Sequence, residues 1–363
     1  MSRGRAGRTA RTLSRDELED WVVRTAQRRP DNWLDTLRAR ALELCDELGV
    51  PGQGDAVADI IGAVAGTRDA RAGAGRLLAA RAAGREYDPD RVARFDELAG
   101  YLRALPPDAD VPVELPALAD EAQTSLPFFE AYFSNFIEGT EFSVEEAEAI
   151  VESGEIPDER PEDAHDVLGT FEAVHDEHLR AATPSTVEEL LELLDRRHRL
   201  VMGGRPDKQP GQFKERSNQA GSYVFVAPTL VEGTLVEGFH RLADLQPGFA
   251  RAVFQLFLIS EVHPYDDGNG RVARAATCAE LTAADRARLV IPIVFRNEYL
   301  TALRNLSRDG RCDLYVRTLA HAWRWTAAMP WRDRAAVDGY LVATNALVDS
   351  TDAERTGVRL ELP

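Results

Sequence analysis

The stretch His263-Pro-Tyr-Asp-Asp-Gly-Asn-Gly-Arg-Val-Ala-Arg274 decides how two apolar segments of the chain are joined. Residues 249–261 are strongly apolar, which predicts a buried helix, and a second helix is expected to start near Asn269. Gly268 and Gly270 let the backbone pass close to a ligand, with positive φ where that is required. The unpaired N–H groups at the start of the second helix and the helix dipole together predict an anion-binding site.

Charged side chains in the same stretch extend this prediction to a polyphosphate. Arg271 and Arg274 are three residues apart, so both project from one helix face near its N-terminus, where guanidinium groups can bind phosphates. Asp267 alone would repel phosphates, but Mg²⁺ typically binds one or two carboxylates together with phosphate oxygens. His263 comes just before the loop, where a neutral imidazole could take a proton from an attacking hydroxyl.

This stretch resembles the signature of the Fic family, His-Pro-Phe-x-(Asp/Glu)-Gly-Asn-Gly-Arg-x-x-Arg, with Tyr265 in place of Phe as the departure. The resemblance covers about residues 115–329. It implies a Fic-type helical core and an enzyme that moves AMP from ATP to a Tyr, Thr or Ser hydroxyl of a protein and releases pyrophosphate. It also implies roles for the matching residues: His263 as the base, Asp267 as the Mg²⁺ ligand, Arg274 for the γ-phosphate, and Gly268, Asn269, Gly270 and Arg271 for the other phosphates.

A second motif, Ser134-Asn-Phe-Ile-Glu-Gly139, is similar to the (Ser/Thr)-x-x-x-Glu-(Gly/Asn) motif of the inhibitory helix in some Fic proteins. The resemblance implies that Glu138 pairs with Arg274 and prevents Arg274 from binding a γ-phosphate. In some relatives the same glutamate positions water for removal of AMP, so Glu138 is a candidate for either reaction. The simpler alternative is a surface helix with Gly139 at its C-terminal end.

A β-prone segment, Tyr223-Val-Phe-Val226, predicts a short hairpin between residues 221 and 235. Residues 210–216, here called the flap segment, and the hairpin after them are similar to the family's flap, whose edge would pair with an extended target segment by strand addition. We therefore expect Tyr223, Val224, Phe225 and Val226 to form this edge, although a hairpin that only covers the core is the alternative. By the same resemblance, Asn297 and Tyr299 are candidates for contacting the adenosine, whereas a helix start is the simpler account of their positions.

Composition restricts the partners that the chain can bind over a wide area. The net charge is −18, and no apolar run reaches membrane-spanning length, so we expect neither a nucleic-acid surface nor a membrane anchor. Three widely spaced cysteines predict neither a disulfide framework nor a metal site, and no signal peptide is apparent. We expect a cytoplasmic protein that binds ATP and an unidentified protein target, which can be the chain itself. The sequence is compatible with a monomer and with an oligomer.

The order of helical patterns predicts a mainly α fold with one β-hairpin flap and an additional helical N-terminal region. Residues 1–12 are expected to be a disordered basic arm, and 13–110 a helical region of unknown role. Residues 111–330 would form the Fic domain, with the inhibitory helix near 130–140, and 331–363 a C-terminal tail. Ser14 with Glu17, and Ser143 with Glu146, have the spacing of capping boxes at helix starts.

The sequence therefore favours a protein adenylyltransferase that is autoinhibited by its own Glu138. One alternative is a Fic enzyme with another donor or with phosphoryl transfer, because the motif indicates a polyphosphate and not a base. Another is a non-catalytic nucleotide-binding interaction protein, against which the intact His263, Asp267 and Arg271 argue.

Overall fold

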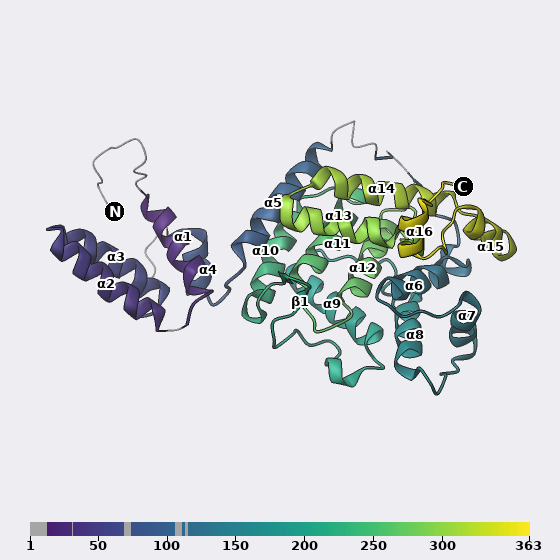
Figure 1. Cartoon of the computed structure of the whole chain (residues 1–363), viewed down its shortest axis with the longest axis horizontal. Coiled ribbons are helices and arrows are strands. Elements are labelled where there is room, and N and C mark those ends of the chain that lie inside the picture. The colour runs from purple at the N-terminus through teal and green to yellow at the C-terminus, as the bar shows by residue number, and fades with distance from the viewer. Residues whose placement is uncertain (1–12, 31, 69–73, 106–110, 113–114) are drawn as a thin grey trace. The chain divides into compact units, whose positions relative to one another are not determined.

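A computed structural model describes residues 13–30, 32–68, 74–105, 111–112 and 115–363 of the 363-residue chain. The chain divides into two compact units, Met1–Pro89 with Glu232–Thr234, and Asp90–Val231 with Leu235–Pro363. The fold is mainly α with one two-stranded sheet, as predicted (Figure 1). The basic arm predicted for residues 1–12 lies outside the described residues. In the described part of the chain, no helix is both long and apolar enough to cross a bilayer.

The first unit contains the helices α1 (Arg15–Ala26), α2 (Trp33–Glu47), α3 (Pro51–Val64) and α4 (Arg76–Ala82). The predicted capping box at Ser14 is confirmed: its hydroxyl accepts from the Glu17 N–H at 3.2 Å, and the Glu17 carboxylate accepts from the Ser14 N–H at 2.8 Å. Pro51 starts α3 a few residues after α2 ends. Proline is well suited to a first helical position, where its missing N–H would have had no partner.

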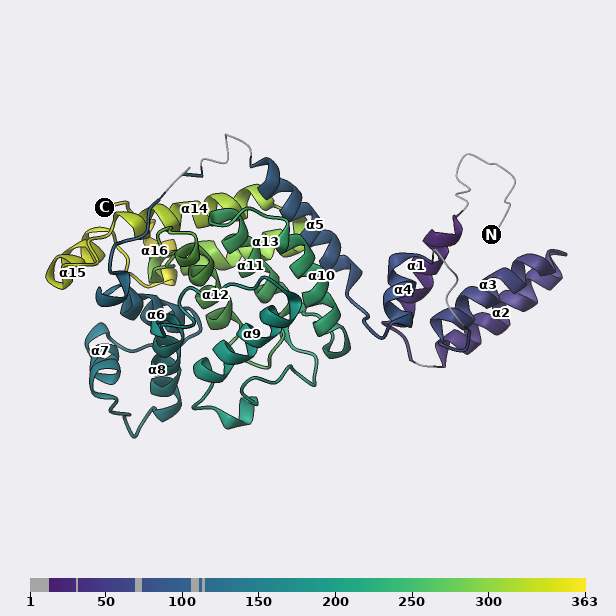
Figure 2. The same cartoon turned by 180° about the vertical axis from the view of Figure 1, so that it is seen from behind.

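The second unit is built around α11 (Phe249–Val262) and α12 (Asn269–Ala283), which are buried along most of their lengths. The segment before this pair includes the helices α6 (Leu126–Ile137), α7 (Val144–Ser153), α8 (Pro161–His175) and α9 (Val187–Val201). Helix α12 packs against α6, α8, α9 and α11 (Figure 2). The other helices of this unit are α5 (Pro89–Ala104), α13 (Arg296–Asp309), α14 (Cys312–Ala328), α15 (Arg334–Ala343), α16 (Ser350–Thr356) and, apart from its residues 232–234, α10 (Val231–Ala243).

The hairpin is formed by β1 (Gln219–Ala220) and β2 (Tyr223–Val224), which are antiparallel. The expectation that it would extend to residue 235 is wrong, because residues 228–230 form a 3₁₀ turn and α10 follows directly. The chain reverses earlier, at Gly221, whose φ of +60° suits a two-residue hairpin loop. The partner of the β-prone segment is therefore the polar Gln219–Ala220 that precedes it.

The C-terminal residues are part of the second unit and not a separate tail. Trp331, Val337, Leu341 and Leu360 are buried in one apolar cluster with residues of α6 and α14. The Trp331 ring lies 5.7 Å from the ring of Phe129, centroid to centroid. The boundary predicted at residue 110 also differs from the observed one, because residues 90–104 of α5 belong to the second unit.

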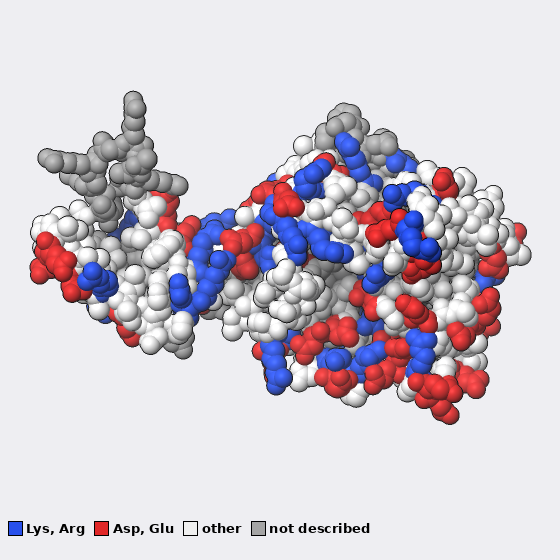
Figure 3. All heavy atoms as spheres, in the orientation of Figure 1, with Lys and Arg blue, Asp and Glu red and all other residues white. Residues whose placement is uncertain are grey.

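Both signs of charge occur over the second unit, and the face in Figure 3 shows acidic and basic side chains interspersed among the described residues. Some of these charges are buried in pairs. The Arg288 guanidinium, 1% exposed, contacts the carboxylates of Glu121 at 2.9 Å and Glu130 at 2.7 Å. These contacts join α6 and the segment before it to the residues that follow α12.

We predict that Glu130→Ala lowers the free energy of unfolding by about 3–5 kcal/mol, because it removes a partner of a buried guanidinium. Chemical denaturation of the full chain measures this. The control is Arg355→Ala, which breaks the exposed pair with Asp352 and should cost below about 1 kcal/mol. Equally small losses of unfolding free energy in both variants would show that the buried Arg288 guanidinium does not need the Glu130 carboxylate as its partner.

Candidate functional site

The loop between α11 and α12 is held in one conformation by its own side chains. His263 ends α11 in the left-handed region, with φ +52°, and Gly268 begins α12 with φ +72°. The Asn269 side chain closes the loop: its Oδ1 accepts from the Tyr265 N–H at 2.9 Å, and its Nδ2 donates to the Tyr265 carbonyl at 2.8 Å. Asn269 was predicted to contact phosphates. Its side chain bonds within the loop instead, so such a contact would have to come from its backbone N–H at the helix start.

The His263 imidazole is arranged to act as a neutral base. The Phe225 ring stacks on it, with centroids 3.8 Å apart and planes 6° apart. Its Nδ1 lies 3.4 Å from the Ser260 carbonyl, which favours the proton on Nδ1 and leaves the Nε2 lone pair available. Burial and, to a smaller extent, the positive charge of Lys214 lower the pKa of His263 to about 4. The imidazole is therefore uncharged at neutral pH.

Lys214 joins the flap segment to this loop, a role that the sequence did not reveal. Its ammonium donates to the His263 carbonyl at 2.7 Å and to Asn218 Oδ1, also at 2.7 Å. Its backbone N–H donates to the Pro264 carbonyl at 2.9 Å. Burial lowers the pKa of Lys214 to about 8, so it stays charged at neutral pH and compensates the C-terminal end of α11.

Glu138, at the end of α6, lies against the first turn of α12. A Cβ atom added at Gly270 would overlap with its carboxylate oxygen Oε1, so this position tolerates only glycine while the carboxylate is there. The carboxylate is thus placed where the free N–H groups of α12 favour negative charge. Gly139 follows with φ +93° and turns the chain away from the site.

The expected ion pair between Glu138 and Arg274 is present, with Arg274 Nη2 at 2.6 Å from Glu138 Oε1. Ser134 completes the contact: its hydroxyl accepts from Arg274 Nε at 2.9 Å, and its carbonyl accepts from Nη2 at 2.9 Å. The Arg274 side chain is 6% exposed and that of Glu138 33%. The predicted Ser134, Glu138 and Arg274 therefore form one unit, in which the carboxylate has access to solvent and the guanidinium does not.

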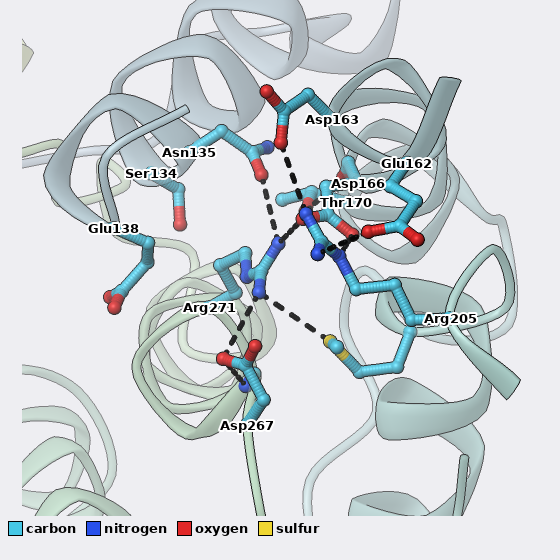
Figure 4. A network of polar contacts seen from close by, with 12 residues as sticks. Ser134, Asn135, Glu138, Glu162, Asp163, Asp166, Thr170, Arg205, Asp267 and Arg271 are labelled. Atoms are coloured by element: carbon cyan, nitrogen blue, oxygen red, sulfur yellow. Dashed lines mark hydrogen bonds and ion pairs between the residues drawn. The ribbon is translucent and has the colours of Figure 1, made fainter. Parts of the chain in front are cut away.

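Arg271 is held by residues that the sequence did not identify. Its Nη1 lies 2.6 Å from Asp166 Oδ2 and 3.4 Å from Asn135 Oδ1 (Figure 4). Arg205, in the loop after α9, donates to the same Asp166 carboxylate at 3.0 Å. Asp166 is a buried residue of α8, and a single buried Asp in a helix carries no spacing signal that would assign it to Arg271.

Asp267 has the surroundings of a ligand for a hard cation. Its Oδ1 accepts from the Gly268 N–H at 2.6 Å and lies 3.4 Å from Arg271 Nη2, and its side chain is 40% exposed. In the described parts of the chain, no group of three or more His, Cys, Asp or Glu residues forms a complete metal site. A single accessible carboxylate beside an anion site fits Mg²⁺, which takes its other ligands from phosphates and water.

The four predicted flap residues differ in their surroundings. Val224 is exposed, whereas Val226 is fully buried, so the predicted edge does not extend to Val226. The Tyr223 hydroxyl bonds to the buried Glu261 carboxylate. Phe225 covers His263, and its N–H donates to the Asn218 carbonyl at 3.1 Å.

The hydrogen-bond pattern of the hairpin determines which peptide groups face outward. Asn218 and Phe225 form a bonded pair, so the next pair, Gln219 and Val224, is non-bonded and points its N–H and carbonyl groups away from the hairpin. The Val224 carbonyl accepts from Arg91 Nη2 at 2.6 Å, which leaves the Val224 N–H as the outward group of β2.

The two residues predicted near an adenosine lie at the start of α13. Tyr299 is 1% exposed, and burial raises the pKa of its hydroxyl, which Arg274 counteracts. Tyr299 therefore lies beside the buried Arg274 side chain and not on an open surface. Asn297 is half-buried in the first turn of α13. Contact of either residue with a nucleoside stays a prediction.

Residues 186–281 match the sequence profile of the Fic/DOC family. The chain is 26% identical over 203 residues to protein adenylyltransferase fic-1 of Caenorhabditis briggsae, covering 53% of this chain and 39% of that protein. It is 25% identical over 268 residues to protein adenylyltransferase Fic of Nematostella vectensis, covering 72% and 58%. The chain thus spans about half the length of these curated relatives.

Solved structures of Fic proteins are also similar. Fic-1 (residues 134–508) of C. elegans has 21% identity and a TM-score of 0.46, with 89% of this chain and 92% of that chain covered. A Fic domain containing signaling protein of Bacteroides thetaiotaomicron has 17% identity and a TM-score of 0.46, with 69% and 97% covered.

We predict a pKa of about 4 for His263 in an NMR titration of its ring signals. Because burial is the main cause, Phe225→Ala should raise this pKa toward the ordinary value of about 6.5 by admitting water. The sign follows from the imidazole being buried in its neutral form: it gains a proton only well below neutral pH. A wild-type pKa near 6.5 would contradict the assignment of His263 as a water-shielded neutral base.

Proposed function

We propose that the chain, whose residues 186–281 match the Fic/DOC family, is an autoinhibited protein adenylyltransferase that moves AMP from ATP to a Tyr, Thr or Ser hydroxyl of a protein. One observation carries the proposal: the Glu138 carboxylate occupies the anion site of α12 and pairs with Arg274, opposite a neutral His263. The curated relatives are named protein adenylyltransferases, which supports the transfer of a nucleotidyl group.

The transfer step uses groups of the α11–α12 loop. His263 Nε2 takes the proton of the target hydroxyl while its oxygen forms a bond to the α-phosphorus of ATP. The bond from that phosphorus to the bridging oxygen breaks, and pyrophosphate leaves with the electron pair. The free N–H groups of Asn269, Gly270 and Arg271 and the two guanidinium groups hold the phosphates.

Asp267 would hold the Mg²⁺ ion that accompanies ATP. When bound, the ion neutralises negative charge on the phosphates and the leaving pyrophosphate. Without the ion, the Asp267 carboxylate would repel the nucleotide, so chelation of Mg²⁺ should abolish transfer.

Autoinhibition follows from competition between two anions. A γ-phosphate and the Glu138 carboxylate would use the same guanidinium and the same helix N-terminus, and they repel each other. While Glu138 is in place, ATP lacks its contact with Arg274 and takes a position that does not favour attack. The carboxylate is partly exposed, so it can leave without disrupting the core.

The hydroxyl substrate would reach His263 along the flap. An extended target segment can add to the outward Val224 N–H, beside the Phe225 ring that covers His263. The target can be another protein or a second copy of this chain. We place the reaction in the cytoplasm, where ATP is abundant and the three unpaired cysteines would stay reduced.

We predict that Glu138→Gly increases transfer of label from α-labelled ATP by about 10–100-fold. An exposed pair contributes below about 1 kcal/mol and a buried one about 3–5 kcal/mol when broken, and each 1.4 kcal/mol corresponds to tenfold. Gel autoradiography, self-modification included, measures this. Glu141→Gly is the matched control: Glu141 is exposed in the adjacent loop, and its substitution should leave transfer at the wild-type level. Equal transfer by Glu138→Gly and wild type would refute the inhibitory role of Glu138.

In the Glu138→Gly background, we expect His263→Ala to reduce transfer by about 10²–10⁴-fold, which is the usual contribution of a general base. Nucleotide binding should persist, since the imidazole is not needed to hold phosphates. The same reactions with γ-labelled ATP distinguish the chemistry: label from the γ-position alone indicates phosphoryl transfer. Binding of nucleotide without transfer of either label would indicate an interaction protein.

A further inference from the structure

The two arginines of the phosphate site are held in different ways. Arg274 is bound by Glu138, whose side chain is 33% exposed, and by Ser134. Arg271 is bound by Asp166, and both of these side chains are only 2% exposed. A partly exposed carboxylate can leave its partner, whereas a buried one is fixed by the surrounding core. Arg274 therefore has a removable partner, and Arg271 has a permanent one.

Asp166 is itself fixed by further contacts of α8 and the loop after α9. Arg205 Nη2 lies 2.8 Å from Asp166 Oδ2, and Arg205 also contacts the carboxylates of Glu162 at 2.9 Å and Asp163 at 3.0 Å (Figure 4). The Thr170 hydroxyl donates to the Asp166 carbonyl at 2.7 Å. One buried carboxylate thus serves two guanidinium groups, and its charge is compensated from both sides.

The remaining contacts of Arg271 define the direction of its guanidinium. Asn135 Nδ2 donates to the Ala131 carbonyl at 2.9 Å, which turns Asn135 Oδ1 toward Arg271 Nη1. Nη1 is therefore occupied by Asp166 and Asn135. Nη2 lies instead 3.4 Å from Asp267 Oδ1 and 3.5 Å from the Met202 sulfur, on the side of the α12 N-terminus.

We infer that Asp166 is a positioning residue for nucleotide binding: it holds Arg271 by Nη1 so that Nη2 is directed at the phosphates. This inference rests on the proposed function. An arginine loses considerable side-chain entropy when it is ordered by a ligand, and a guanidinium that is already fixed avoids that cost on binding. Asp166 does not touch the nucleotide and acts only through Arg271.

The test measures the Kd for Mg²⁺·ATP by isothermal titration calorimetry in the Glu138→Gly background, where Arg274 is free. Asp166→Asn should weaken binding by about 10-fold or more, which is typical of a lost charge-assisted contact. Asp163→Asn is the matched control, since Asp163 contacts Arg205 but not Arg271 in the contacts described above, and it should change Kd by less than about twofold.

A combined variant separates positioning from a general structural effect. With Arg271→Ala already present, Asp166→Asn should leave Kd unchanged within about twofold, because two residues that act as one unit are not additive. Equal weakening by Asp166→Asn with and without Arg271 would overturn the inference, as would a Kd in Asp166→Asn equal to that of the control.

Asp166→Asn leaves the buried Arg271 guanidinium and the partly buried Arg205 guanidinium without their shared carboxylate, and it can fail to fold. The double variant Asp166→Asn/Arg205→Met removes one charge of each sign and is the second test. It should show the same weakening of Mg²⁺·ATP binding, and an unchanged Kd would overturn the inference. If Glu138→Gly itself binds no Mg²⁺·ATP, the proposed function fails together with this inference, whereas normal binding in Glu138→Gly and in Asp166→Asn refutes the inference alone.

Discussion

The first turn of α12 requires a negative charge, and the rest of the site is arranged around that requirement. The turn presents unpaired N–H groups, and the buried Arg274 adds a full positive charge beside them. In this structure the Glu138 carboxylate supplies the anion. A phosphate of a bound nucleotide would satisfy the same groups. On the proposed function the two anions would compete for these groups, and this competition is the basis of the proposed inhibition.

One short loop joins His263, the proposed base, to the first turn of α12, the proposed anion site. The conformation of this loop therefore fixes the position of both. The Asn269 side chain bonds to the Tyr265 backbone, and the Lys214 ammonium donates to the His263 carbonyl. The Phe225 ring shields the His263 ring from water. These three contacts come from α12, the flap segment and the residue that follows β2. The His263 imidazole and the first turn of α12 are thereby kept a few residues apart by contacts that do not involve Glu138. Removal of the inhibitory carboxylate should consequently leave the base in place.

Local signals in the sequence predicted the parts of this structure that local chemistry determines. The capping box at Ser14 and the glycine-rich start of α12 were visible because a few adjacent residues specify them. The pairing of Glu138 with Arg274 came from a resemblance, since 136 residues separate them. Asp166 and Lys214 were missed because their roles arise only when α8 and the flap segment pack against α12 and the loop. The strand partner Gln219–Ala220 was missed for a related reason: it is polar and gains its structure from the turn at Gly221.

The most direct test of the account is a pair of crystal structures, of wild type and Glu138→Gly, each with Mg²⁺ and a non-hydrolysable ATP analogue. In Glu138→Gly we expect the γ-phosphate to bind Arg274, with the α-phosphorus facing His263 Nε2. In wild type, Arg274 should stay bound to Glu138 and the phosphates should lie elsewhere. The same phosphate positions in both proteins, with Arg274 bound to the γ-phosphate in each, would contradict the claim that Glu138 and the γ-phosphate compete for one site.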